Sequence, residues 1–391
     1  MPPKVFIVAG EHSADHHGAA LVRAMRELAP DVEVQGYGGK CLAAEGALVK
    51  DDLVNNAVMG IAAVIPRIPF FLRTLREAAR WIAEWKPDIV IPIDNPGFNM
   101  CLSMRVRFKG PRVLYYVSPQ VWAWWRSRIK GFKRKVDKML VLFPFEEPLY
   151  QEQGIRVEYV GHPLFDYIPA ETTDPNYRAS IGLGPDEPLV VLLPGSRNKS
   201  TARLLPLILD VAARVKAARP KTRFVLPCAR PHFIGPAKAA VAARGLDVAV
   251  TDGRAHEAMR AARCAIVTSG TSTLECLYFE LPMVITYRLG LVEWLGLKAV
   301  LATKHIGYAN IIADREIVPE FLDWRDRPDD IARATIELLD EGPRREQCLK
   351  DLRAARATLG DAGASRRAAQ AALSLIKEKR RRVNGRSGSH A

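Results

Sequence analysis

Residues 5–35 read VFIVAGEHSADHHGAALVRAMRELAPDVEVQ, and this stretch decides the fold. The apolar run Val5–Ala9 is typical of a buried parallel strand, and Gly10 ends it. Apolar residues then recur at helical spacing over Gly18–Leu28, and Val32–Gln35 has the pattern of a second strand. A strand, a helix and a strand in this order predict a parallel sheet.

The same alternation continues along the chain in two series. In the first series, strands are predicted at Ile89–Ile93, Val113–Val117 and Met139–Leu142, preceded by a helix at Phe71–Trp85. The second series contains five apolar runs, at Leu189–Leu193, Phe224–Pro227, Val248–Thr251, Ala265–Thr268 and Met283–Thr286. The sequence therefore predicts an α/β protein with two Rossmann-like domains facing one cleft.

The two series also suggest where the domains begin and end. We expect an N-terminal domain over residues 1–166, a linker rich in Pro, Asp and Thr over 167–188, and a C-terminal domain over 189–350. Residues 351–376 are expected to form a helix that packs back on the N-terminal domain or on a partner. The basic and then Gly/Ser-rich residues 377–391 are expected to be a disordered tail.

Composition narrows the class of protein. The chain has 391 residues, of which 48% are apolar and 26% charged, which is ordinary for two globular domains. No apolar run approaches the roughly 18 residues of a membrane-spanning helix, and Val5–Ala9 is too short for a signal-peptide core. The six cysteines form no CxxC pair, so we expect reduced thiols in a cytosolic protein rather than a zinc or disulfide framework.

The net charge of +14 is concentrated in two places, Arg105–Lys138 and Lys377–Arg386. A basic balance of this kind favours anionic partners, which include nucleic acid, acidic phospholipid and phosphorylated substrates. The basic stretches contain no recognisable nucleic-acid reader motif, so we expect no nucleic-acid partner.

Two loops in the second series are suited to a nucleoside diphosphate. In the loop Pro194–Ser200, Gly195 permits close approach of a phosphate and Arg197 can bind it bidentately, with Ser196 beside them. An N-cap at Ser196 or Ser200 would give the same pattern.

The second of these loops is Ser269–Glu275. Its backbone amides and hydroxyls can hold a pyrophosphate at a helix N-terminus, and Glu275 can accept the hydroxyls of a ribose. The alternative is ordinary helix capping by Thr271 with an acid in the first turn. Two such loops in one domain favour the nucleotide.

In the first domain, the loop Gly10–Gly18 contains three histidines and two carboxylates. These suggest a metal site, but no matching ligand set occurs elsewhere, so we expect no metal; helix capping by Asp15 or Ser13 is the alternative. The loop lacks GxGxxG spacing, so a dinucleotide is not expected.

A second first-domain loop, Asp94–Asn99, follows a strand, and an acid at a strand end suits a general base. In the later stretch Tyr115–Trp125, tryptophans beside arginines can stack on a sugar, or form part of a core.

From about Lys4 to Ile376 the chain resembles the lipid-A-disaccharide synthase family. The motifs that carry the resemblance occur in family order: Gly10-Glu11…Ser13…Asp15…Gly18-Ala19, Val58-Met59-Gly60, Asp94-x-Pro96-x-Phe98-Asn99, Tyr116–Trp124, Pro144-Phe145-Glu146, Val160–Leu164, Pro194–Arg197, Ser269–Glu275 and Asn310-Ile311. The VSPxVWAW string is specific to the family, whereas SGTxTLE is shared with related glycosyltransferases.

The resemblance implies a GT-B type fold and an inverting, metal-independent transfer that needs no cofactor. UDP-2,3-diacylglucosamine would be joined to 2,3-diacylglucosamine 1-phosphate, with release of UDP, by an enzyme of the cytoplasm that is peripherally bound to the inner membrane. A homodimer through the C-terminal segment is a further implication. The stretch that would face the bilayer or accept acyl chains contains Ile61, Ile65, Ile68, Phe70, Phe71 and Leu72, flanked by Arg67 and Arg73; a buried helix face is the alternative.

Site residues follow from the motifs and the resemblance together. Catalytic roles are expected for Asp94, Asp15, Glu11 and Arg197, with His12 a further candidate base. Donor-binding roles are expected for Gly195, Ser196, Arg197, Ser269, Gly270, Thr271, Thr273, Glu275, Asn310 and Glu320. Acceptor-binding roles are expected for Ser13, Met59, Asn99, Ser118, Trp122, Arg126 and Arg128.

The chain departs from the family pattern at several positions. Most important, Gly97 stands where the family has a second aspartate, a proposed catalytic base. The other departures are His12, Ala14, Asn198-Lys199-Ser200, Asp323 in place of a usual glutamine, and Trp125 in place of a frequent arginine. Another group can serve as base, catalysis can be impaired, or the acceptor can differ. The alternatives are therefore a paralogous transferase, a UDP-sugar epimerase, or a non-catalytic binder of UDP-sugar or acidic lipid.

Overall fold

The computed structural model describes residues 1–50, 53, 67–107, 110–120, 126–168, 174–291, 293–294 and 303–387. For His12, residues 126–128 and residues 382–387, only the backbone is described. The chain forms two compact units. Unit 1 comprises Met1–Tyr167 together with Asp361–Ala391, and unit 2 comprises Ile168–Gly360.

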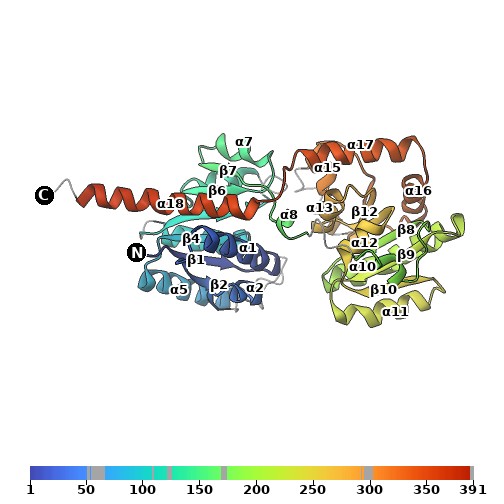
Figure 1. The fold of residues 1–391 in the computed structure, drawn as a ribbon, viewed down its shortest axis with the longest axis horizontal. Helices are drawn as coiled ribbons and strands as arrows, with labels where there is room; N and C mark the ends of the chain where they lie inside the picture. The colour runs from blue at the N-terminus through green and yellow to red at the C-terminus, as the bar shows by residue number, and fades with distance from the viewer. Residues whose placement is uncertain are drawn as a thin grey trace. The chain divides into compact units, whose positions relative to one another are not determined.

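Unit 1 is built on a seven-stranded parallel sheet in the order β3-β2-β1-β4-β5-β6-β7 (Figure 1). Its strands are β1 (Lys4–Ala9), β2 (Glu33–Tyr37), β3 (Leu48–Lys50), β4 (Ile89–Ile93), β5 (Arg112–Tyr116), β6 (Lys138–Val141) and β7 (Val157–Tyr159). Ala9 pairs with Ile93, and Ile93 pairs with Tyr116. The loops after β1, β4 and β5 therefore leave the same edge of the sheet.

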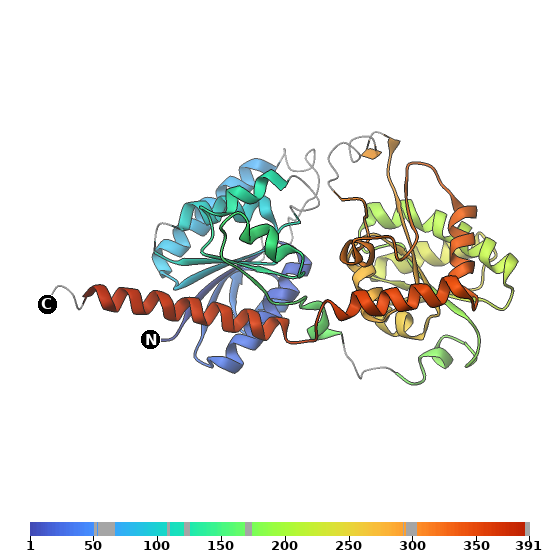
Figure 2. The ribbon, with the colours of Figure 1, turned by 90° about the horizontal axis from the view of Figure 1, so that it is seen from above.

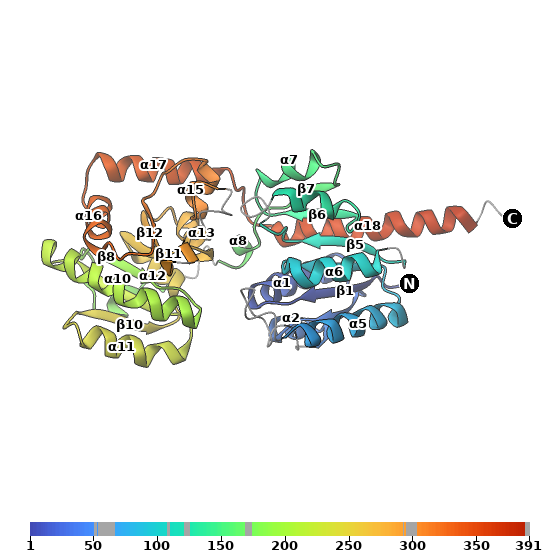
Figure 3. The same cartoon turned by 180° about the vertical axis from the view of Figure 1, so that it is seen from behind.

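Helices cover both faces of this sheet. They are α1 (His12–Leu28), α2 (Lys40–Ala44), α5 (Ile68–Trp85), α6 (Pro96–Val106), η2 (Arg126–Phe132), α7 (Glu146–Gln151), α8 (Leu164–Tyr167) and α18 (Ala364–Ser387). Helix α1 packs against α18 on one face, and α5 packs against α6 on the other (Figures 1 and 3).

The alternation of side chains in β1 explains this layering. Phe6 belongs to the core formed with Ala78 and Ile82 of α5, and its ring meets Trp81 edge-on with centroids 5.2 Å apart. On the opposite face, Gly18 of α1 lies so close to the sheet that a Cβ there would be 3.3 Å from Ile93 Cδ1. Every residue of β1 after Lys4 is buried, as expected of a central strand.

Unit 2 contains a six-stranded parallel sheet in the order β10-β9-β8-β11-β12-β13. Its strands are β8 (Leu189–Leu193), β9 (Arg223–Cys228), β10 (Val248–Asp252), β11 (Cys264–Thr268), β12 (Met283–Arg288) and β13 (Glu320–Asp323). Its helices are α9 (Tyr177–Ser180), α10 (Asn198–Ala218), η3 (Pro231–Phe233), α11 (Ile234–Ala242), α12 (Ala255–Ala261), α13 (Thr271–Tyr278), α15 (Tyr308–Ala313), α16 (Pro328–Leu339) and α17 (Pro343–Ala357). Helices α10 and α16 pack together, and α17 packs on α13 and α15.

The C-terminal segment differs from the single helix expected over 351–376. Helix α17 ends at Ala357 in unit 2, and α18 begins at Ala364 in unit 1 (Figure 2). Two glycines in left-handed conformation, Gly360 at φ 66° and Gly363 at φ 105°, separate the helices. Asp166 then caps α18, because its carboxylate accepts the amides of Gly363, Ala364 and Ser365 at 2.6, 3.1 and 2.7 Å.

Helix α18 continues to Ser387, so the part of the expected disordered tail over residues 377–387 is helical. Its last described side chains are held by contacts that lie far away in sequence. Arg380 binds the Asp88 carboxylate at 2.7 Å and donates to the carbonyls of Met1 and Pro2 at 2.8 and 2.9 Å. In the described part of the chain, no helix combines the length and the apolar character needed to cross a membrane.

Candidate nucleotide-sugar site

The two phosphate-type loops of unit 2 adjoin each other. Strands β8 and β11 are parallel neighbours, with Leu193 paired to Val267, so the loops that follow them leave the same edge. Gly195 has φ 109°, and a Cβ at this residue would lie 3.2 Å from Thr268 Cγ2. The close packing and the left-handed conformation together explain why glycine is required here.

Arg197 is the exposed cation of the first loop. It occupies the N-cap position of α10, and its carbonyl accepts the amide of Thr201 at 2.9 Å. Within the described ranges, no ion pair engages its guanidinium. Ser196 beside it is also exposed. The loop therefore presents a positive group at a helix N-terminus, where an anion is favoured.

The neighbouring cations of α10 are already paired. Glu293 binds Lys199 Nζ at 2.8 Å and Arg203 Nη1 at 2.6 Å. Hydrogen bonds from Lys199, from the Gly290 amide and from Arg203 lower the pKa of Glu293 to about 2. Lys199 and Arg203 therefore carry compensated charge, whereas Arg197 is available to a ligand.

In the second loop, two of the predicted hydroxyls are used within the protein. Ser269 Oγ donates to the Ile306 carbonyl at 2.6 Å, and the buried Thr273 Oγ1 donates to the Gly270 carbonyl at 2.8 Å. Thr273 Oγ1 also accepts the Tyr308 amide at 3.1 Å. These hydroxyls fix the loop, and Thr271, at the start of α13, remains exposed.

Asn310 and Glu320 form a buried support behind this loop. Asn310 Oδ1 accepts the amides of Ile317 and Val318, and its Nδ2 donates to the Val318 carbonyl and to Glu320. Because all four hydrogen-bonding positions are used, Asn310 positions the loop and does not present a free group to the donor. The expected direct contact of Asn310 with the donor stays a prediction.

Glu320 in turn accepts the amides of Ile306 and Gly307, each at 2.9 Å. Burial raises its pKa, although these hydrogen bonds oppose the shift. In the described chain it holds the segment 306–310 against the second loop, and the expected direct contact with the donor stays a prediction.

The carboxylate expected to bind ribose, Glu275, has an unforeseen partner. His256 Nε2, from α12, lies 3.4 Å from Glu275 Oε1. Sequence analysis did not single out His256, although it stands just after the predicted strand Val248–Thr251, where ligand-binding residues gather in parallel sheets.

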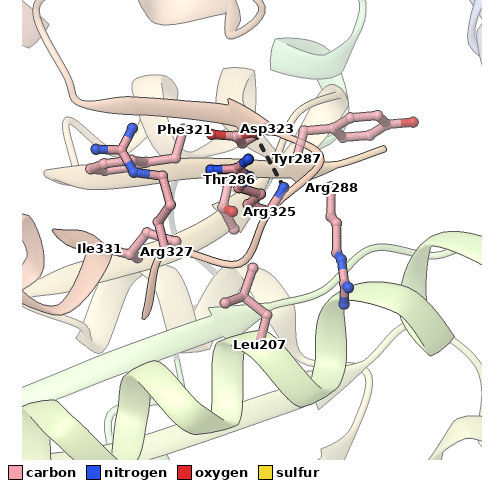
Figure 4. A pocket seen from close by; sticks show the side chains of 9 residues that line it. All are labelled: Leu207, Thr286, Tyr287, Arg288, Phe321, Asp323, Arg325, Arg327 and Ile331. Carbon is pink, nitrogen blue, oxygen red and sulfur yellow. Dashed lines mark hydrogen bonds between the residues drawn. The ribbon is translucent and has the colours of Figure 1, made fainter. Parts of the chain in front are cut away.

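A small cavity lies between α10 and the strands β12 and β13 (Figure 4). Arg288, Arg325 and Arg327 line it, but its volume of about 10 Å³ holds only about one water molecule, so it is not a nucleotide site. Asp323, which replaces the family's usual glutamine, accepts the amides of Trp324 at 2.7 Å and Arg325 at 3.2 Å. The aspartate thus closes the turn after β13.

In unit 1, the buried Asp15 is a capping residue. Its carboxylate accepts the amides of Gly39 at 2.7 Å, Cys41 at 3.0 Å and Leu42 at 3.1 Å, at the start of α2. The capping alternative therefore describes the contacts of Asp15 in the structure, and its expected catalytic role stays a prediction. Glu11 occupies the N-cap position of α1 and is partly exposed, and Ser13 is exposed.

Asp94 lies in a strained turn at the carboxyl edge of unit 1. Asp94 and Asn95 have φ values of 50° and 44°, and Val117 after the next strand has φ 63°. Left-handed conformations at such residues are costly and persist only when the surroundings impose them. Here the Asp94 carbonyl accepts the Tyr115 hydroxyl at 2.6 Å and Asn99 Nδ2 at 2.7 Å.

The first loop and the Asp94 turn are in direct contact. A Cβ at Gly10 would lie 2.5 Å from Asn95 Nδ2, so a side chain at residue 10 would require the Asn95 amide to move. The carboxylate of Asp94 is partly exposed beside this contact. The turn therefore holds an acid at a fixed place on the edge of the sheet, as a general base requires.

The structure describes the side chains of only some of the expected acceptor-binding residues. Asn99 is fully buried and ties α6 to β4, since its Nδ2 donates to the carbonyls of Ile93 and Asp94. Ser118 is buried and donates to Glu146 at 2.6 Å. These two residues shape the loops. Met59 and Trp122 lie outside the described residues, and Arg126 and Arg128 belong to η2 with only their backbone described.

Gly97 lies in the first turn of α6 and is exposed. Among the residues that the structure describes, none has a heavy atom within 4 Å of a Cβ built on it. Packing against the described residues therefore does not require the absence of a side chain here.

Metal ligation is not apparent in the residues with described positions: they contain no group of three or more His, Cys, Asp or Glu side chains that could hold a metal ion. In the Gly10–Gly18 segment of unit 1, His17 is buried, and its ring lies edge-on to that of His162 with centroids 5.8 Å apart.

These two buried histidines predict a loss of stability in acid. Burial and the nearby His16 lower the pKa of His17 to about 4, although Asp166 opposes the shift, and burial lowers the pKa of His162 well below its usual value. Since an unfolded histidine titrates near pH 6.5, unfolding takes up protons as the pH falls from about 6.5 to 4. Over this pH range the free energy of unfolding falls by about 3 kcal/mol through His17 alone.

We therefore expect His17→Leu to flatten the fall in thermal stability between pH 6.5 and 4, as measured by calorimetry across that range. The exposed His232, changed to Gln, serves as the matched control. An unchanged pH slope in His17→Leu would show that this ring does not contribute.

Two parallel sheets of Rossmann type, with glycine- and hydroxyl-rich loops joined at the carboxyl edge of the second, define a nucleotide-sugar enzyme of GT-B type. Solved structures share the fold. UDP-GlcNAc 2-epimerase from Neisseria meningitidis bound to UDP-GlcNAc superposes with a TM-score of 0.62 at 10% identity, over 95% of this chain and 99% of that one. MurG from Acinetobacter baumannii superposes with a TM-score of 0.59 at 15% identity, over 96% of this chain and 100% of that one.

The family model for lipid-A-disaccharide synthetase matches residues 5–375. Lipid-A-disaccharide synthase from Myxococcus xanthus is 39% identical over 376 residues, which cover 96% of this chain and 98% of the relative. The enzyme of the same name from Azotobacter vinelandii is also 39% identical, over 377 residues, with 96% and 98% coverage. The chain belongs to the lipid-A-disaccharide synthase family, which confirms the expected family and the GT-B type fold.

Proposed function

We propose that this enzyme transfers 2,3-diacylglucosamine from UDP to the 6-hydroxyl of 2,3-diacylglucosamine 1-phosphate, with inversion at the anomeric carbon. The observation that carries the proposal is the junction of the Gly195–Arg197 loop with the start of α13 in unit 2, in a chain of this family. The family relationship identifies the reaction, and the junction supplies a place for the diphosphate.

The donor half of the reaction belongs to unit 2. The bond from the anomeric carbon to the diphosphate breaks, and negative charge develops on UDP. Arg197 and the amides at the start of α13 are placed to stabilise that charge, each well-aligned donor contributing on the order of 3–4 kcal/mol. Glu275 accepts hydrogen bonds from the ribose hydroxyls.

The acceptor half belongs to unit 1. The acceptor's 6-hydroxyl oxygen forms the new bond to the anomeric carbon, and its proton passes to a base, for which we propose Asp94. Two features support the choice: Asp94 follows β4 at the carboxyl edge, and its turn is fixed by Tyr115 and Asn99. Glu11, at the start of α1 on the same edge, is the alternative base.

Asp94→Asn is expected to lower kcat about 100-fold, because a positioned base contributes roughly 100- to 10,000-fold. The backbone contacts of residue 94 are retained by asparagine, so the Kd for UDP should stay within about a factor of two. Steady-state kinetics and calorimetric titration with UDP give the two values. Wild-type turnover in Asp94→Asn would remove Asp94 as the base, and Glu11→Gln would then be the next variant to measure.

We also propose that the enzyme acts peripherally at the cytoplasmic surface of the inner membrane, where its acylated substrates lie. Supporting features are found on α5. Ile68 and Leu72 are 45% and 41% exposed at its start, and Arg67 and Arg73 flank them. Exposed apolar side chains beside cations suit the interface of an anionic bilayer.

A homodimer through the C-terminal segment is part of the proposal. In a single chain α18 buries Ala368, Ala372, Leu375 and Ile376, and it packs on α1 of its own unit. Exchange of α18 between two copies across the Gly360–Gly363 segment would reproduce these contacts. Light scattering after size exclusion measures the oligomeric state.

Incubation with UDP-2,3-diacylglucosamine and 2,3-diacylglucosamine 1-phosphate tests the proposed reaction. Formation of the β-linked disaccharide 1-phosphate together with an equal amount of UDP is the expected result. Release of UDP without disaccharide would indicate another acceptor or an epimerase, and saturable binding without turnover would indicate a non-catalytic binder. Either outcome would replace the proposal.

A further inference from the structure

A histidine pairs with the ribose-binding carboxylate of the proposed donor site. His256 Nε2 lies 3.4 Å from Glu275 Oε1, and both side chains are mostly buried, at 29% and 19% exposure. The His256 ring also lies beside Phe279, with centroids 6.0 Å apart. Glu275 and Phe279 are four residues apart at the end of α13, so His256 contacts one face of that segment at two points.

The backbone that delivers His256 is strained. Gly253 and Arg254, immediately before α12, both have φ 62°, which is a costly conformation for arginine. Several contacts hold Arg254 there. Its guanidinium binds Asp174 at 2.8 Å and Glu257 at 3.3 Å, and it lies over the Tyr177 ring at 4.7 Å.

The position of this turn links the strain to the site. Strand β10 is at the edge of the sheet, and α12 leads the chain from β10 back toward β11, passing β9 and β8. A turn that starts α12 in this direction brings His256 to the side of α13 on which Glu275 lies. The strained turn therefore lies at the point that sets the direction of α12 and, with it, the position of the His256 side chain.

We propose that His256 is a positioning residue for the donor ribose, acting through Glu275. By donating from Nε2 to Oε1, the imidazole holds one carboxylate oxygen and leaves Oε2 directed at the ribose hydroxyls. This inference rests on the proposed function, because it requires the nucleotide to occupy unit 2. A contact that only joins α12 to α13 would affect folding but not the recognition of ribose.

The test compares the binding of UDP and 2′-deoxy-UDP by calorimetric titration. Wild-type enzyme is expected to prefer UDP by roughly 10- to 100-fold, since a hydroxyl bound to a buried carboxylate is lost in the analogue. In His256→Ala this preference should fall about 3- to 10-fold, whereas the affinity for 2′-deoxy-UDP should change less than twofold. His256→Gln, whose amide can donate from a similar position, should recover most of the preference.

Two further variants separate positioning from a structural role. His256→Ala combined with Glu275→Ala should show the same preference as Glu275→Ala alone, because the histidine acts only through the carboxylate. Arg353→Gln is the matched control: it removes an exposed ion pair with Glu280, just beyond α13, and should leave the preference unchanged.

Each outcome has a definite meaning. An unchanged preference in a folded His256→Ala, or an equal loss of affinity for both nucleotides, would overturn the positioning role. If His256→Ala does not fold, a wild-type preference in His256→Asn, whose shorter amide cannot reach Glu275, would overturn it as well. A wild-type enzyme that binds neither nucleotide would contradict the proposed function itself.

Discussion

Replacing Arg197 with alanine is expected to lower kcat/KM by about 100- to 1,000-fold and to weaken UDP binding at least tenfold. The reason is that Arg197 is an exposed guanidinium at the start of α10, next to the junction with the α13 loop. Removing one preformed donor from a site of developing negative charge typically costs this much. Steady-state kinetics and titration with UDP measure both effects.

Lys199→Ala provides the matched control for this variant. Lys199 is also an exposed cation of the same helix, but Glu293 compensates its charge. We expect a change of less than about threefold in kcat/KM, because an exposed ion pair contributes little. Equal effects of the two substitutions would mean that general positive charge is responsible. Unchanged kinetics in Arg197→Ala would reject the donor-site assignment.

In the Asp94→Asn background, Gly97→Asp is expected to raise kcat by about 100-fold, whereas in the otherwise wild-type enzyme, where Asp94 is the proposed base, it should change kcat less than about threefold. The resemblance described above implies an aspartate, a proposed catalytic base, at this position in the family, and a general base contributes roughly 100- to 10,000-fold. The described part of the fold accepts the side chain, since a Cβ at Gly97 meets none of its heavy atoms within 4 Å, and the residue lies in the first turn of α6. An acid near a helix N-terminus should also stabilise the protein by about 0.3–1 kcal/mol.

Gly97→Asn is the control, because it has the same shape without the charge. Added to Asp94→Asn, it should leave kcat within about a factor of three of that variant. No rise in kcat when Gly97→Asp is added to Asp94→Asn would show that an acid at residue 97 does not act as the base. A large rise in the otherwise wild-type enzyme would show that Asp94 does not supply the base.

The central strands and the edge strand β10 were predictable from the sequence, whereas the short edge strands β3, β7 and β13 were not. Val5–Ala9, Ile89–Ile93 and Leu189–Leu193 are continuous apolar runs because both faces of a central parallel strand are buried. Edge strands such as β7 and β13 have three or four partly exposed residues. Such segments lack an apolar run, and pairing with the neighbouring strand makes them strands.

The position of the glycine- and hydroxyl-rich loops after β8 and β11 was also predictable, because such residues after a strand are a local pattern. The roles of individual polar side chains were not. Asp15 caps a helix that begins 25 residues later, and Asn310 binds the segment before β13. The partners of such residues are set by tertiary structure, which a local pattern does not contain. His256 was missed for the same reason.

The path of α18 has a consequence for biosynthesis. Unit 1 is discontinuous, since its last helix is translated only after all of unit 2, and this helix covers α1 and binds the chain's first residues through Arg380. While residues 168–360 emerge from the ribosome and fold, unit 1 of the nascent chain therefore lacks α18. The surface of α1 that α18 covers is exposed during this time. Premature termination before Ala364 would leave that apolar surface permanently open to aggregation or chaperones, even though both sheets had been made.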